Sequence, residues 1–362
     1  RQDVERLAQR KRIGRGAARG AAQSLDRGLP VLETGISLIR PDGPCYRGRS
    51  AVDMVHAGAT LEDTARLLWD CGEHDPFAAP ALNAWPRRAA AIARDAELPP
   101  LERALSVIPL LGLDVRHSFN LDLSVRHDIA AGLLRQNAAL LVAAEPGARP
   151  VHRLLAHAWR PGDDAFADIV RAALVLCADH ELNVSAFAAR VVASTGAHLH
   201  ATVCTGLSAL SGPRHGGATA RAYALIAEAR DSGRPADHVQ ARWNRGDDLP
   251  GFGHALYPDG DPRASTLLAM LRTHRGRTAA MRAIDQVIAG GEAASGQRPN
   301  IDFLLAAICH VYALPATPAL VLFASGRLTG WLAHALEQQA LGKLIRPRAH
   351  YVGAVPEGGA PG

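Results

Sequence analysis

Residues 168–210 are apolar on nearly every helical face, and they constrain the fold more than any other stretch. A helix on a protein surface keeps one polar face toward water, whereas a helix that is apolar all round lies inside a larger bundle. Alanine, the strongest helix former, recurs throughout the chain, and only 5% of the residues are aromatic. The sequence therefore predicts an all-α protein, and its 362 residues are enough for one large core or two domains.

Helix signals recur on both sides of this stretch. Thr60 is a predicted N-cap, with Glu62 and Asp63 in the first turn and Gly72 at the end. Further helices are expected after Pro100, over 130–145 and 166–179, from Ala218, over 264–272 and 278–290, from Asp302, and from Pro318 to Leu341. One exception is expected near the start, where the Pro-Asp-Gly turn of residues 41–43 separates two short β-prone segments and predicts a small β-hairpin.

The basic character of the chain comes from its first residues. The net charge is +5, and residues 1–20 contain seven arginines and lysines against Asp3 and Glu5. The rest of the chain is therefore neutral overall. Such a segment either contacts nucleic acid or an upstream domain, or is simply a solvated arm, and we favour the solvated arm.

Cysteine usage indicates a reducing, cytoplasmic environment. The five cysteines are scattered and include no CxxC motif: Cys45, Cys71, Cys177, Cys204 and Cys309. We predict no metal site, because His198 and His200 have no matching second pair and the HELNV of residues 180–184 is not HExxH. No signal peptide and no uninterrupted apolar run long enough for a membrane span are seen, so no membrane association is expected.

The first candidate for chemistry is His215, which follows a helix stop and precedes a helix start in the segment SGPRHGGATARAY. Gly216 and Gly217 would let a ligand approach the backbone. The positive end of the helix disfavours an imidazolium ion, so a neutral His215 could donate a hydrogen bond to a carbonyl oxygen and stabilise an enol. The alternative is a structural, capping histidine.

Two further candidate sites lie at helix ends: one is the carboxylate of Asp302, and the other is a group of three neighbouring residues. Asp302 heads an apolar helix, where a carboxylate is usually only a cap; a sheltered carboxylate could also act as a general base. Asp179, His180 and Glu181 lie where two buried helices are expected to meet. A buried charged trio needs either a satisfied polar network or a ligand, and both interpretations stay open.

The last candidates lie on a glycine-rich turn and among the arginines. His254 follows Gly251-Phe252-Gly253, and this segment is either an ordinary loop or half of a binding site for a small dianion. Arginine binds carboxylates through two parallel hydrogen bonds, and a dicarboxylate would need more than one arginine. The candidates are Arg263, Arg327 and Arg346.

Taken together, these segments resemble the citrate synthase family in order and spacing. The resemblance rests on YRGRSAVDMV, ADHELNVSAF, GPRHGGA, GFGHALYPDGDPRA, RPNIDF and SGRLTGWLAHALEQ followed by LIRPRAHYVG, and it extends from Leu32 to Gly353. It implies a two-domain helical fold in which a small domain closes over the substrates. The implied organisation is a basic segment at 1–29, a large domain at 30–215 and 315–362, and a lid domain at 216–314.

The resemblance also implies the roles of the catalytic residues. Members of the family condense an acyl-CoA with a 2-oxo acid, usually acetyl-CoA with oxaloacetate, in the tricarboxylic acid cycle. Asp302 would remove a proton from the acetyl methyl group, and His215 would stabilise the enol. His254 would polarise the keto carbonyl of oxaloacetate and protonate the new alkoxide.

The implied binding residues surround these three. His180, Arg263 and Arg327 would hold oxaloacetate, and Arg346 would reach the site of the other subunit in a homodimer. The turn Gly251-Phe252-Gly253 would bind CoA. The resemblance requires no metal or redox cofactor.

Two departures from the family pattern stand out. Members often carry a lysine or arginine after the tyrosine equivalent to Tyr257, where it helps to hold the CoA phosphates, but here Pro258 follows. We expect Arg214, which precedes the candidate histidine, to replace part of that charge. The basic segment at 1–29 is also unusual, and by analogy with some relatives it predicts an upstream helix-turn-helix module.

Three functions are compatible with the sequence. The first is a citrate synthase. The second is a 2-methylcitrate synthase that uses propionyl-CoA, since acyl pockets of the two enzymes differ by one methylene. The third is a non-catalytic, ligand-sensing regulator with the same fold, against which the presence of His215, His254 and Asp302 argues. The other histidines, such as His56, His157 and His334, are expected to be structural.

Overall fold

The computed structural model describes residues 32–113, 122–347, 349 and 352–353. Residues Gly35–Lys343 form one compact unit, and Arg1–Thr34 with Leu344–Gly362 form another. The predictions for the basic segment at 1–29, including its link to an upstream module, lie outside the described residues.

The predicted hairpin is confirmed and carries one additional strand. Strand β1 (Ser37–Arg40) pairs antiparallel with β2 (Gly43–Tyr46), and β2 pairs with the short β3 (Arg49–Ser50). Gly43 has a φ of 122°, which favours glycine in the turn. The hydroxyl of Tyr46 donates to the carbonyl oxygen of Val175 at 2.9 Å, which ties the hairpin to the core.

Helices make up almost everything else, which confirms the predicted all-α class. Helix α2 spans Ala51–His56, and α3 spans Leu61–Leu68 behind the predicted Thr60 cap, where Asp63 completes a capping box. The remaining helices before residue 212 are α4 (Arg87–Ala93), α5 (Pro100–Gly112), α6 (Leu123–Leu141), α7 (Val151–Trp159), α8 (Asp164–Cys177), α9 (Val184–Ser194) and α10 (Leu199–Leu210). Nearly all of α8 is buried, as its apolar faces predicted.

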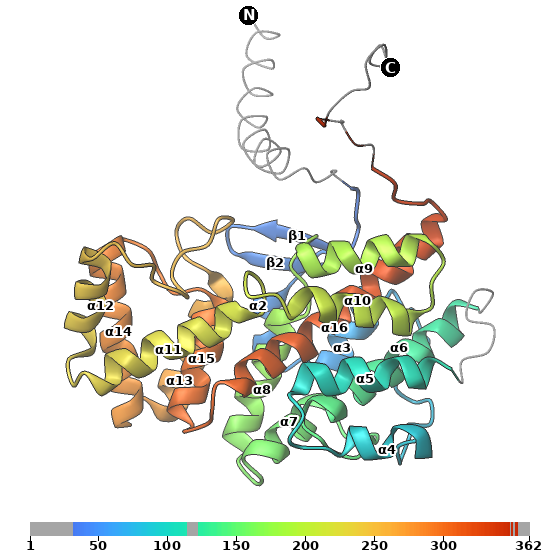
Figure 1. Cartoon of the computed structure of the whole chain (residues 1–362), viewed down its shortest axis with the longest axis horizontal. Helices are drawn as coiled ribbons and strands as arrows, with labels where there is room; N and C mark the ends of the chain where they lie inside the picture. Colours follow the sequence, from blue (N-terminus) through green and yellow to red (C-terminus); the bar gives the residue numbers. More distant parts are fainter. Residues whose placement is uncertain (1–31, 114–121, 348, 350–351, 354–362) are drawn as a thin grey trace, which may run out of the picture. The chain divides into compact units, whose positions relative to one another are not determined.

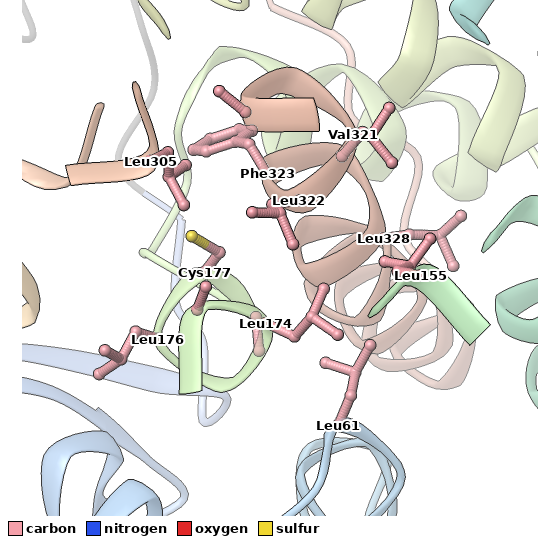
Figure 2. Close-up of a cluster of buried hydrophobic side chains, with 14 of the residues drawn as sticks. Leu61, Leu155, Leu174, Leu176, Cys177, Leu305, Val321, Leu322, Phe323 and Leu328 are labelled. Carbon is pink, nitrogen blue, oxygen red and sulfur yellow. The ribbon is translucent and has the colours of Figure 1, made fainter. Parts of the chain in front are cut away.

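Helix α16 (Thr317–Leu341) is the centre of this part of the core and packs against α8, α9, α10, α6 and α3 (Figure 1). Leu322 and Leu328 of α16 and Leu174 of α8 belong to one cluster of buried hydrophobic side chains (Figure 2). The close approach of α16 to the end of α8 depends on a glycine, because a Cβ on Gly330 would lie 2.6 Å from the carbonyl oxygen of Ala178. By length and composition α16 could cross a membrane, but 94% of its apolar window is buried inside the protein, as expected for a core helix.

Five helices pack on one another after residue 216 (Figure 1). They are α11 (Gly217–Asp231), α12 (Pro235–Asn244), α13 (Pro262–Arg275), α14 (Ala279–Ser295) and α15 (Ile301–Val311). Helix α12 was not expected, because its sequence is mostly polar and buries only Pro235 and Val239. This group meets the rest of the core where α15 and α11 pack on α16 and where α13 packs on α8. The predicted division into a large domain and a lid at 216–314 stays a prediction, because these helices belong to the one compact unit Gly35–Lys343.

Candidate active site

The glycine-rich turn is docked on the segment that leads into α15. The backbone N–H of Gly253 donates to the carbonyl of Arg298, and that of Asn300 donates to the carbonyl of Gly251, each at 2.8 Å. The side-chain amide of Asn300 donates to the carbonyl of Gly253 at 2.9 Å. Gly251 has a φ of 90°, and a Cβ there would lie 2.8 Å from Cβ of Phe303, so this packing requires glycine. The turn before His254 is thereby fixed beside the start of α15.

Asp302 is not the cap of its helix, so the capping interpretation is wrong. Asn300 is the N-cap, and its side-chain oxygen accepts the backbone N–H groups of Asp302 and Phe303 at 3.0 and 3.3 Å. The carboxylate of Asp302 therefore has no capping role. Burial raises its pKa to about 6, although the nearby cations Arg263 and Arg327 oppose that shift.

His254 belongs to a cluster of three rings with His180 and Tyr257. Ring centroids of His180 and His254 are 5.2 Å apart, and the Tyr257 hydroxyl lies 3.0 Å from Nε2 of His180. Nδ1 of His254 accepts the backbone N–H of Leu256 at 3.1 Å. Burial, with the charge of Arg263, lowers the pKa of His254 to about 4, so the ring is neutral at pH 7. A neutral ring that accepts at Nδ1 carries its proton on Nε2 and can donate from there.

The three residues of the predicted charged trio separate in the structure. His180 is buried, and burial holds its pKa well below the ordinary value. Asp179 is also buried: its Oδ2 accepts from the hydroxyl of Ser37 and from the N–H of Glu181 at 3.2 Å, whereas its Oδ1 has no hydrogen bond within the described residues and lies 3.3 Å from Nε2 of His334. Glu181 is exposed, so the expectation of a buried trio is wrong for this residue.

Arg263 is fully buried and already holds a carboxylate that the sequence interpretation missed. Its Nε and one terminal nitrogen donate to the two oxygens of Asp261 at 2.9 and 2.8 Å. The same carboxylate accepts the backbone N–H of Ile301 at 3.0 Å, next to Asp302. Asp261 precedes Pro262 at the start of α13, and an aspartate before proline at a predicted helix start is a signal that could have identified it.

Arg327 is buried too, but it keeps hydrogen-bonding capacity. Its Nε donates to the carbonyl of Cys177 at 2.9 Å, and its guanidinium lies 4.8 Å from the ring centroid of Phe323. Within the described part of the chain, Nη1 of Arg327 is buried without a hydrogen-bond partner. An unsatisfied buried guanidinium N–H is costly, and a carboxylate ligand would satisfy it.

His215 lies between α10 and α11, as predicted, and contacts Ser185 of α9. Its Nε2 is 2.8 Å from the hydroxyl of Ser185, which also accepts the indole N–H of Trp331 at 3.1 Å. Burial, with the charge of Arg327, lowers the pKa of His215 to about 4. Because Ser185 occupies Nε2, Nδ1 is the ring nitrogen left for a ligand. Ser185 was also missed, and no local pattern in the sequence identifies it.

A groove of about 800 Å³ adjoins the glycine-rich turn. Gly251 and Phe252 contribute to it, together with Arg221 and Arg242 on α11 and α12 and the half-exposed Trp243. Arg214 is exposed and is not among the residues that line this groove. Arg346 is exposed and belongs to the other unit, so its predicted role in a partner's site stays a prediction. Of the remaining histidines, His334 is buried, whereas those at 56 and 157 are exposed.

The structure thus brings most of the predicted site residues together. The positive charges of Arg263, Arg327 and Arg221 each lower the pKa of Asp302. The charge of Arg327 also lowers the pKa of His215. In the described residues, no three histidine, cysteine, aspartate or glutamate side chains are arranged to hold a metal ion. The arrangement offers one carboxylate of raised pKa, neutral histidines and two buried guanidinium groups, which suits proton removal from carbon beside a bound carboxylate.

Comparisons with known proteins point the same way. The family described as citrate synthase, C-terminal domain, matches residues 24–348. Citrate synthase 2 of Bacillus subtilis is 35% identical over 50% of this chain and 50% of its own length. The 2-methylcitrate synthase of Shewanella oneidensis is 35% identical over 52% and 51%. The chain spans about half the length of these curated relatives, whereas a citrate synthase of Mycolicibacterium smegmatis is 29% identical over 90% of this chain and 94% of its own.

The fold has a solved counterpart. The ternary complex of carboxymethyl coenzyme A and oxaloacetate with citrate synthase from Thermoplasma acidophilum superimposes with a TM-score of 0.77. The two chains are 23% identical, and the match covers 92% of this chain and 96% of the other. This likeness shows the shared fold. The family match over residues 24–348 establishes that the chain belongs to the citrate synthase family.

Proposed function

We propose that the protein is a citrate synthase, which condenses acetyl-CoA with oxaloacetate and water to give citrate and CoA. The observation that carries the proposal is the carboxylate of Asp302, which does not cap its helix and whose pKa is raised to about 6. A general base works best when its pKa lies near the working pH. The neighbouring histidines and arginines supply the groups that the rest of the reaction needs.

In the first step Asp302 takes a proton from the methyl group of acetyl-CoA. A carbon acid beside a thioester is weak, so removal of the proton requires that the developing enolate oxygen be stabilised at the same time. His215 does this in its neutral form with a hydrogen bond from Nδ1, while Nε2 accepts the hydroxyl proton of Ser185 in preference to the side-chain oxygen of Asn183. Its lowered pKa, about 4, keeps the ring from acting as a permanent cation at that position.

In the second step the enol attacks the keto carbon of oxaloacetate. His254, whose free Nε2–H is set by the Leu256 contact at Nδ1, polarises the keto oxygen and protonates the new alkoxide. Arg327 and Arg263 hold the carboxylates with their remaining N–H groups, and His180 helps to orient the substrate. Water then hydrolyses the citryl thioester, which makes the overall reaction irreversible.

The groove beside Gly251 and Phe252 is the proposed site for CoA, with Gly253 completing the turn. Trp243 offers a flat apolar surface for the adenine ring, and Arg221 offers a cation for a phosphate. Arg214 remains a candidate for a second phosphate contact. The reaction as proposed uses protein side chains alone, in a cytoplasmic homodimer in which Arg346 completes the partner's site. An upstream helix-turn-helix module also remains part of the proposal.

Replacing either candidate arginine by alanine should raise the KM for acetyl-CoA and leave the KM for oxaloacetate unchanged. We expect an increase of about threefold to tenfold for Arg221→Ala, the effect of losing one partly solvated charged hydrogen bond, and a smaller one for Arg214→Ala. Arg242→Ala is the matched control, because Arg242 lines the same groove but is already paired with Glu228 at 3.1 Å. An unchanged KM in Arg214→Ala would remove Arg214 from the CoA site.

The pH dependence of kcat/KM should have an acid limb with a midpoint near pH 6. Asp302 must be ionised to act as a base, and its pKa of about 6 means that activity falls as the pH drops through that value. His215 and His254, with pKa values of about 4, stay neutral over this range and add no second limb there. A midpoint at the ordinary aspartate value, near 4, would contradict the assignment.

The experiment that tests the function is release of free thiol on mixing the protein with oxaloacetate and acetyl-CoA. Release that requires both substrates supports the enzyme. No release above background, with oxaloacetate still bound, would favour a ligand-sensing regulator. A higher kcat/KM for propionyl-CoA than for acetyl-CoA would favour 2-methylcitrate synthase.

A further inference from the structure

Helix α16 binds the chain directly before His180. Nε of Arg327 donates to the carbonyl oxygen of Cys177, and the backbone N–H of Gly330 donates to the carbonyl oxygen of Ala178, both at 2.9 Å. Arg327 and Gly330 are three residues apart, so they lie on the same face of the helix. The backbone up to residue 178 is therefore fixed against α16.

The side chain of Asp179 fills a notch in the same face of α16. A Cβ on Gly330 would collide with Oδ1 of Asp179, so the notch exists because this residue is a glycine. The same oxygen lies 3.3 Å from Nε2 of His334, four residues further along the helix, and both side chains are fully buried. Burial opposes the ionised form of Asp179, but the interactions with His334 and Arg327 outweigh it and lower the pKa of the carboxyl group.

The other oxygen of Asp179 fixes the residue that follows His180. Oδ2 accepts the backbone N–H of Glu181 at 3.2 Å and also accepts from the hydroxyl of Ser37 in β1. The hydroxyl oxygen of Ser37 accepts the same N–H at 3.1 Å. Glu181 has a φ of 57°, which is unfavourable for a residue other than glycine, so the turn depends on these bonds. One carboxylate thus fixes the chain on both sides of His180.

Resting on the proposed function, we infer that Asp179 is a positioning residue that holds His180 where its ring can bind oxaloacetate. The ring of His180 is buried and lies 3.0 Å from the hydroxyl of Tyr257, so it has one well-defined place in the site. Both oxygens of Asp179 lie against protein groups, so Asp179 acts on the substrate through His180. A shift of about 1 Å in a binding group can lower activity by about a hundredfold.

The test measures two constants for oxaloacetate in wild type, Asp179→Asn and Ser37→Ala: the KM, by thiol release at saturating acetyl-CoA, and the dissociation constant, by calorimetry. Asp179→Asn keeps the size of the side chain and should raise both constants roughly tenfold to a hundredfold. Ser37→Ala removes one bond to the carboxylate and should raise them about threefold. The KM for acetyl-CoA should stay unchanged. A residue that only supports the fold would reduce the amount of active protein, and therefore kcat, without changing either constant.

A double-mutant cycle shows whether Asp179 acts through His180. In a His180→Ala background, Asp179→Asn should change the dissociation constant of oxaloacetate by no more than about twofold, because the ring that it positions is absent. Asp128→Asn is the matched control. Asp128 also pairs with a histidine, His74 at 2.7 Å, but this pair is partly exposed and lies on α6, so both constants should stay unchanged.

Each outcome decides the inference. Unchanged constants in folded variants, or an equal rise in the His180→Ala background, would overturn it while the proposed function stands. If Asp179→Asn does not fold, Ser37→Ala in the two backgrounds gives the same decision. A wild type that binds oxaloacetate but releases no thiol would remove the proposed function, and the dissociation constants would still test the role of Asp179. A wild type that does not bind oxaloacetate would remove both.

Discussion

Replacing Asp302 with asparagine should lower kcat by roughly two to four orders of magnitude, the usual contribution of a positioned general base. The change keeps the size of the side chain and removes only its ability to take a proton. Oxaloacetate should still bind, because its proposed ligands are Arg327, Arg263 and the histidines. The measurement is steady-state thiol release together with oxaloacetate affinity by calorimetry.

Asp259→Asn is the control for this prediction. Asp259 is an exposed aspartate in the turn between His254 and Arg263, so it is near the site without facing it. We expect its kcat to stay within about twofold of the wild type. A kcat for Asp302→Asn within tenfold of the wild type would show that another group removes the proton.

Replacing Asp261 with asparagine should cost about 3–5 kcal/mol of unfolding free energy, because it leaves Arg263 as a buried cation without a counter-ion. The two side chains are 0% and 2% exposed and share two hydrogen bonds, and Asp261 also holds the backbone at Ile301. Urea unfolding followed by circular dichroism gives the difference. The oxaloacetate KM should rise as well, because Arg263 loses the group that orients it.

The control for Asp261 is an ion pair of the same types on the surface. Arg272 and Asp285 are 2.7 Å apart, with side chains 51% and 39% exposed, so Asp285→Asn should cost no more than about 1 kcal/mol. Equal losses in the two variants would mean that burial of the Asp261–Arg263 pair contributes nothing to stability.

The loss in Asp261→Asn should also depend on pH. Burial works against the ionised carboxylate, but the charge and hydrogen bonds of Arg263 outweigh it and lower the pKa of Asp261 in the folded protein. A lowered pKa stabilises the fold fully above the unfolded value, near 3.9, and the stabilisation fades as the pH falls below it toward the folded value. The difference between wild type and Asp261→Asn should therefore shrink in acid and stay constant from about pH 5 upward.

Much of the local structure could be predicted because it depends on neighbours in the chain. Thr60 caps α3 through Asp63, three residues away, and the turn at Gly43 closes a hairpin between adjacent strands. The apolar faces of residues 168–210 required burial whatever their partners. Helix α12 was not predicted, because its few apolar residues show no clear helical periodicity.

The roles of charged residues needed more than local reasoning. The position of Asp302 favoured a capping role, but the N-cap of α15 is Asn300, two residues earlier. Glu181 was expected to be buried with its neighbours, but the chain turns there with a φ of 57° and leaves it exposed. Neither outcome is encoded in spacing, because each depends on how the backbone enters the next helix.

By itself the sequence determined the helical class, the hairpin, the helix starts and the family-like order of the candidate segments, since these follow from short-range periodicity, capping and residue identity. Only the tertiary structure decided which charges meet. It brought Ser185 within hydrogen-bonding distance of His215, 30 residues away in the chain. It also brought the carboxylate of Asp261 to the backbone N–H of Ile301, 40 residues away. It also removed enough water from Asp302 to raise its pKa, and that desolvation comes from elements far apart in the chain, so no local pattern could report it.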